Sequence, residues 1–61
     1  TFAEAIIGTR YRSRRGDGVI VSAQLRDTYD QTYVVEVEER DFPTWKPTGR
    51  RFYATIVRCD D

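Results

Sequence analysis

Ten of the 61 residues are lysine or arginine, and several of them occupy positions from which they would act together. Arginines at every second residue share one face of a strand, and further basic residues surround a pair of prolines. These two basic groups contain Arg10, Arg12, Arg14, Lys46, Arg50 and Arg51. Basic side chains interleaved with aromatic rings can contact phosphates and stack on bases, and Tyr11, Trp45 and Tyr53 supply the rings. One candidate function is therefore nucleic-acid binding.

The segment around Trp45 suggests a different partner, another protein. Trp45 lies between Pro43 and Pro47, where its ring would either cap the open end of a barrel or anchor a partner. Tryptophan, tyrosine and arginine contribute most to the energetics of protein interfaces. On this ground the predicted contact residues are Trp45, Phe42, Tyr29 and Arg12. We expect a protein partner or self-association as the function, with nucleic acid as the alternative.

A third interpretation is that the arginines form ion pairs with acidic residues on the same solvent-exposed face of the sheet. The strand pairing expected below sets Arg12 across the middle strand from Glu36, and Arg14 across it from Glu38. Strands two apart are separated by about 10 Å, which long arginine side chains can span. Such exposed ion pairs contribute about 0–1 kcal/mol each. The carboxylates lack the spacing of a calcium-binding loop, so we expect no metal site.

The residues that most enzymes use for catalysis are nearly absent. The sequence has no histidine, and Cys59 is its only cysteine. A cysteine nucleophile needs a neighbouring base, and common zinc sites need several histidine or cysteine ligands. We therefore expect a non-enzymatic protein without a cofactor, in which Cys59 is a packed or half-exposed free thiol. A single thiol also favours a reducing compartment, so we expect a cytoplasmic protein.

Length and composition limit the fold to one small domain, residues 1–61. A chain of this size buries only about 60% of the surface that its unfolded form exposes, so docking on a partner would help to stabilise it. Ten acidic residues balance the ten basic ones, which is not the strongly basic balance of a general nucleic-acid binder. No apolar run approaches the roughly 20 residues of a membrane span, and we expect no membrane partner.

Alternation of apolar and polar residues predicts strands in four stretches, 9–14, 19–25, 32–38 and 51–59. The inward-facing residues of the second and third stretches are Val19, Val21, Ala23, Leu25, Tyr33, Val35 and Val37. The fourth stretch is rich in strand-forming residues on both faces, with Phe52, Ala54 and Ile56 on one of them. That composition predicts a strand covered on both sides or one that closes a barrel.

The two hairpins can be given a register. For the first, a three-residue loop over residues 16–18 pairs Ser13 with Val21 and sets every side chain on a consistent face. We favour it over a two-residue Asp-Gly turn. For the second, Val21 would pair with Val37 and Ala23 with Val35, which leaves a loop over residues 27–31.

The predicted fold is mainly all-β, a small antiparallel meander of four or five strands, either an SH3-like barrel or a strongly bent sheet. The segment 39–49 contains both prolines and should be irregular through most of its length. Thr1 and Glu4 match a capping box and Gly8 a stop signal, which favours a short helical turn over residues 2–7. The alternative is an extension of the first strand through a bulge at Gly8.

Overall fold

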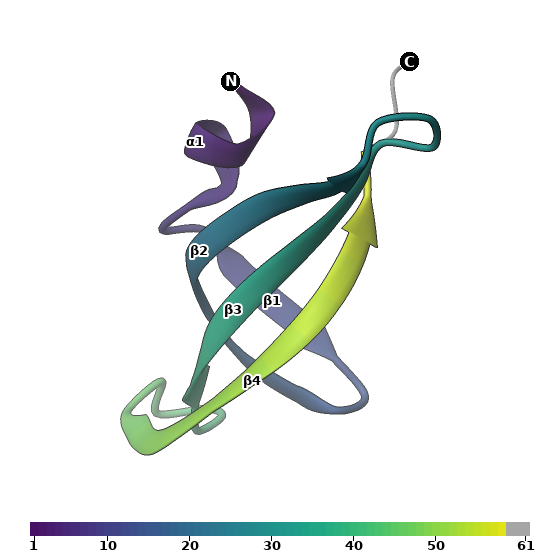
Figure 1. Ribbon diagram of the computed structural model, residues 1–61. Helices are drawn as coiled ribbons and strands as arrows, with labels where there is room; N and C mark the ends of the chain where they lie inside the picture. The colour runs from purple at the N-terminus through teal and green to yellow at the C-terminus, as the bar shows by residue number, and fades with distance from the viewer. Residues whose placement is uncertain (59–61) are drawn as a thin grey trace.

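The computed structural model describes residues 1–58 of the chain. Helix α1 (Phe2–Ile6) precedes four strands, β1 (Arg10–Ser13), β2 (Gly16–Asp27), β3 (Thr32–Arg40) and β4 (Pro47–Val57). All neighbouring strands are antiparallel and form one sheet in the order β1-β2-β3-β4, which bends strongly on itself (Figure 1). The predicted four-stranded meander is confirmed, and it takes the form of a bent sheet with two edges. The prediction for Cys59 lies outside the described residues.

The N-terminal segment forms the short helix that the capping residues predicted. The Thr1 hydroxyl accepts a hydrogen bond from the backbone N–H of Glu4 at 3.2 Å, which satisfies one of the free donors of the first helical turn. From this helix Phe2 places its ring 4.9 Å from that of Tyr33, measured between centroids. The helix therefore packs on the sheet and is not an extension of β1. Within residues 1–58, no helix has the length and apolar character to cross a membrane.

The core lies on the concave side of the sheet and is small. Its buried hydrophobic residues are Ile20, Tyr33, Val35, Val37 and Ala54. The inward orientation of the β3 residues is thus confirmed, and on β4 the set that includes Phe52 and Ile56 packs against the same core. The opposite face of β4 is open, because Tyr53 is 64% and Val57 is 59% exposed. The expectation that β4 is covered on both sides or closes a barrel is therefore wrong, since β4 is an edge strand of an open sheet.

A bulge in β2 changes the inward face that alternation alone predicted for this strand. Ala23 pairs with Val35 as expected, but Val37 pairs with Ile20 because the register shifts between Ile20 and Ser22. The extra residue moves Ile20 into the core, where it is 4% exposed. Leu25 lies after the bulge and pairs with the buried Tyr33, but near the end of the strand it is itself 46% exposed. A bulge inserts one residue and breaks the period of two, which is why the predicted Val21–Val37 pair is wrong. The loop that follows is also shorter than expected, since Asp27 already pairs with the first residue of β3.

The first hairpin turns earlier than predicted. Ser13 pairs with Gly16 and Tyr11 with Gly18, so the turn consists of Arg14 and Arg15 and the two glycines belong to β2. The physical reason is close approach between neighbouring strands. A Cβ atom on Gly18 would collide with the backbone carbonyl oxygen of Glu38 and lie 2.6 Å from Cγ1 of a buried valine. Gly18 therefore lies within the sheet, where a side chain would not fit, and not in a loop.

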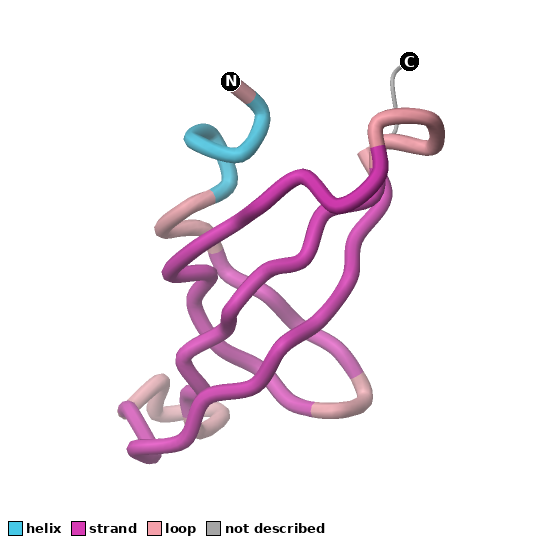
Figure 2. Tube along the Cα trace, viewed as in Figure 1, coloured by secondary structure: helices cyan, strands magenta, loops and turns pink. Residues whose placement is uncertain are grey.

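The connections divide between the two ends of the sheet (Figure 2). The loop 28–31 joins β2 to β3 at one end, while the turn of Arg14 and Arg15 and the loop 41–46 lie towards the other. The irregular part of the predicted segment 39–49 is thus limited to residues 41–46, because β3 continues to Arg40 and β4 begins at Pro47.

Candidate binding surfaces

Two arginines of β1 stack on two aromatic rings of the loop 41–46. The guanidinium carbon of Arg10 lies 4.7 Å from the centroid of the Trp45 ring, and that of Arg12 lies 4.6 Å from the centroid of the Phe42 ring. We call these four residues the arginine–aromatic surface. Its outer pair is open to solvent, because the Arg12 side chain is 61% exposed and Phe42 is 58% exposed.

Hydrogen bonds within the loop hold these rings in place. The backbone N–H of Asp41 donates to the carbonyl of Lys46 at 2.8 Å, and the N–H of Trp45 donates to the carbonyl of Asp41 at 2.6 Å. The Arg40 side chain donates through Nη1 to the Trp45 carbonyl at 3.3 Å and through Nη2 to Glu38 at 2.9 Å. Trp45 itself is half-buried beneath Arg10. The ring thus belongs neither to the buried core nor to a freely projecting side chain.

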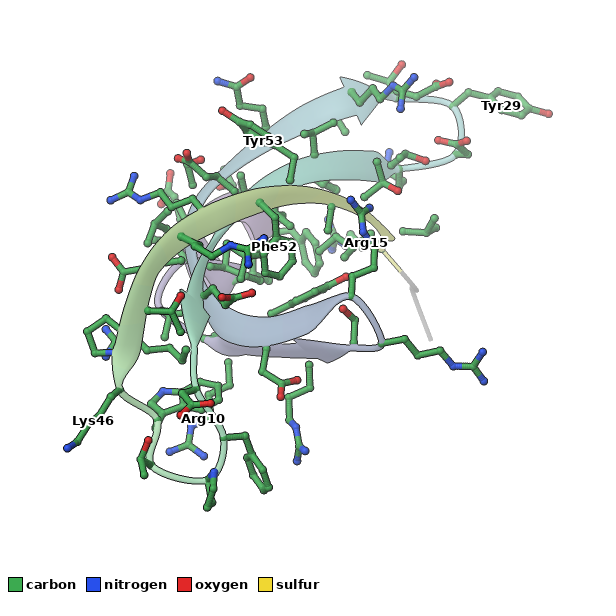
Figure 3. The ribbon with its side chains drawn as sticks, turned by 90° about the horizontal axis from the view of Figure 1, so that it is seen from below. Arg10, Arg15, Tyr29, Lys46, Phe52 and Tyr53 are labelled. Atoms are coloured by element: carbon green, nitrogen blue, oxygen red, sulfur yellow. The ribbon has the colours of Figure 1, made fainter. Side chains whose placement is uncertain are left out.

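Tyr29 does not join this surface. It lies in the loop 28–31 at the opposite end of the molecule from Arg10 and Lys46 (Figure 3). Its side chain is 96% exposed, and its backbone N–H donates to Asp27 Oδ1 at 2.8 Å. Three of the four residues predicted to contact a protein partner are therefore brought together, and the fourth is separate.

The six basic residues predicted to bind nucleic acid come from several elements. Arg10 and Arg12 stack on rings of the loop 41–46, which also contains Lys46, while Arg14 belongs to the β1–β2 turn and Arg50 and Arg51 belong to β4. Two of the six also have acidic partners. The Nε of Arg12 lies 3.6 Å from Asp17, and Arg51 lies 3.6 Å from Glu36.

These ion pairs correct the pairing predicted for the outer face. We expected Arg12 to reach Glu36 and Arg14 to reach Glu38, but Arg51 of the adjacent strand β4 contacts both carboxylates, at 3.6 and 3.8 Å. The cause is the earlier turn of the first hairpin, which sets Arg12 opposite Asp17. Among the described residues, no group of three or more acidic or cysteine side chains is arranged to hold a metal ion.

Two hollows lie beside β4, and sequence reasoning did not find them. One of about 180 Å³ is lined by Arg15, Glu39, Arg50, Arg51 and Phe52. The other, of about 210 Å³, is lined by Arg15, Arg26, Val34, Tyr53, Ala54 and Thr55. Arg15 reaches both because the bent sheet brings the β1–β2 turn back towards β4 (Figure 3). The sequence places Arg15 beside a turn but carries no signal for this return.

Comparison with known protein families, with curated proteins and with solved structures gives no match to this chain.

Proposed function

We propose that this chain is a non-enzymatic binding module that engages a protein partner through the arginine–aromatic surface. The observation that carries the proposal is the stacking of Arg12 on Phe42, in which both side chains are more than half exposed. Arginine and aromatic residues are the types that most often dominate the energetics of protein interfaces. A large exposed ring paired with an exposed cation offers a partner both apolar area and hydrogen-bond donors.

The stacking also holds the side chains in place before a partner arrives. A stacked guanidinium presents its N–H donors around the rim of its plane while the ring covers one of its faces. Ordering a flexible side chain on binding costs about 0.5–1.5 kcal/mol, and part of that cost is met here by contacts within the free protein. Asp17 restrains Arg12 further at 3.6 Å. The surface is thus more organised than isolated exposed side chains would be.

The two hollows beside β4 are small for a small-molecule site. Small-molecule sites have volumes of about 300–1,000 Å³, whereas the two hollows beside β4 measure about 180 and 210 Å³. Binding by an exposed surface needs no enclosed pocket.

Nucleic-acid binding is the second candidate, and the exposed basic residues Arg14, Lys46 and Arg50 favour it. Against it, the guanidinium group of Arg10 already covers one face of Trp45. Of the other two rings expected to stack on bases, Tyr11 packs against Phe52 while Tyr53 stays exposed. Titration of single-stranded DNA and RNA at about 50 mM salt, followed by fluorescence anisotropy, tests this candidate. Its signature is an affinity that falls steeply as salt rises, and no binding at low salt would exclude it.

A displayed library of random peptides, sorted against the intact chain, tests the protein-binding proposal. The affinity of the enriched peptides is then measured for wild type, for Phe42→Ala and for Tyr29→Ala. We expect at least a tenfold loss for Phe42→Ala, corresponding to about 1.4 kcal/mol, because hot-spot truncations commonly exceed that cost. Tyr29→Ala is the matched control, since it removes a similar exposed ring from the opposite end. Equal affinity for all three proteins would refute the proposal.

A further inference from the structure

The free edge of β4 is the longer of the two sheet edges. β4 pairs with β3 on one side, and as the last strand in the order β1-β2-β3-β4 it has no strand on the other. It contains 11 residues, against 4 in the opposite edge strand β1. An edge strand presents unpaired backbone N–H and C=O groups, to which another chain can add as a further strand.

The hollows beside β4 follow one another along this edge. Residues 50–52 line the first and residues 53–55 line the second. Arg15 borders both, so the β1–β2 turn lies alongside the middle of β4, near Phe52 (Figure 3). Phe52 faces the core side of β4 and Tyr53 the opposite side, so neighbouring side chains of an added strand, which point to opposite faces, could enter the two hollows.

The side chains around the hollows are strongly biased towards positive charge. Four arginines line them, and the single carboxylate is Glu39. Glu39 accepts a hydrogen bond from the Thr48 hydroxyl at 2.7 Å, and Arg51 faces Glu36 and Glu38. The remaining arginines form no ion pair within the described part of the chain; they are Arg15, Arg26 and Arg50. A bound segment with carboxylates would supply negative charge to these three arginines.

From this edge and its charge we propose that β4 binds an extended acidic segment of a protein partner by strand addition. The backbone of the segment pairs with the free edge of β4, and its carboxylates face Arg15 and Arg50. A peptide fits this edge better than a nucleic acid does, because the edge offers alternating donors and acceptors and a phosphate backbone can only accept. The site is separate from the arginine–aromatic surface and does not depend on it.

A fluorescein-labelled peptide that alternates valine and glutamate is the probe, and its binding to the full chain is followed by anisotropy. Arg15→Gln and Arg50→Gln should each weaken binding about tenfold, because a charge-assisted hydrogen bond is lost in each variant. Arg14→Gln is the matched control: Arg14 occupies the same turn and lines neither hollow, and its affinity should stay at the wild-type value. A peptide N-methylated at alternate residues should not bind, since it lacks the N–H groups that an added strand uses.

Several results would overturn the proposal. Absence of binding to wild type, or equal binding of the N-methylated peptide, excludes strand addition. Equal losses for Arg14→Gln and Arg15→Gln would indicate general charge attraction and not a site at β4. Tighter binding of single-stranded DNA that also depends on Arg15 would assign the hollows to nucleic acid, and a rise in molar mass that depends on Arg15 would assign the edge to a second copy. Circular dichroism confirms that each variant is folded.

Discussion

The packing of Gly18 gives the sharpest test of the hairpin that positions Arg12 and Arg15. Sequence patterning predicts a loop over residues 16–18, whereas in the structure Gly18 is a buried residue of β2 facing the backbone of β3. In Gly18→Ala, the added Cβ would collide with the Glu38 carbonyl oxygen and lie 2.6 Å from Cγ1 of Val37. Val37 is fully buried at 0% exposure, so neither atom can move without disturbing the sheet.

The expected cost follows from this crowding. Overpacking a well-packed interior costs about 1–3 kcal/mol, and a collision with backbone belongs at the upper end of that range. A domain of this size has a total stability of about 3–9 kcal/mol. A loss of about 3 kcal/mol would lower Tm by about 12–24 °C and would leave about 0–6 kcal/mol of stability.

Thermal and urea unfolding followed by circular dichroism measure this cost, with Gly49→Ala as the matched control. Gly49 has φ +87° and no atom within 4 Å of an added Cβ, so alanine there pays only for backbone strain, about 1–2 kcal/mol. We expect Gly18→Ala to be clearly the less stable variant. If Gly18 instead occupied a left-handed loop position, the two variants would lose similar stability, and that result would refute the hairpin register.

Three further changes test other parts of the structure. Val35→Ala should lower the free energy of unfolding by about 2–3 kcal/mol, measured by urea denaturation, because Val35 is 0% exposed; a loss under about 1 kcal/mol would contradict its place in the core. Arg51→Gln should cost less than about 1 kcal/mol at low salt and almost nothing at about 1 M salt, because the Arg51 side chain is 55% exposed; an unfolding cost that does not change with salt would contradict simple ion pairing. Phe42→Ala should leave Tm within a few degrees of wild type, because the ring is 58% exposed, and if self-association is the function it should also lower the molar mass measured by sedimentation velocity.

Much of the fold follows from local patterns that survive in the structure. Alternation correctly predicts the inward residues of β3, and the capping residue Thr1 correctly predicts α1. Both signals depend on neighbours in sequence, through the period of two in a strand or through the first turn of a helix. The pairing of Ala23 with Val35 is also correct, because it depends only on the hydrophobic period after the bulge.

The predictions from sequence fail where a contact with another strand determines which residue type fits. Gly18 lies in a segment whose composition is typical of a turn. In the structure, glycine is required there because β3 passes too close for a side chain. No sequence pattern predicts the bulge beside Ile20, although this bulge determines which residues of β2 are buried. The same limitation applies to the candidate sites. The stacking of Arg12 on Phe42 joins residues thirty positions apart, and the return of Arg15 to β4 depends on the bend of the whole sheet.

The protein-binding proposal is tested most directly by mapping where an enriched peptide binds. Amide chemical shifts of the isotope-labelled chain are recorded while a peptide from the displayed library is added. The proposal predicts that the largest changes occur in β1 and in the loop 41–46, around Arg12 and Phe42, and that Phe42→Ala removes them. Changes concentrated in the loop 28–31 around Tyr29, or changes that persist in Phe42→Ala, would contradict it.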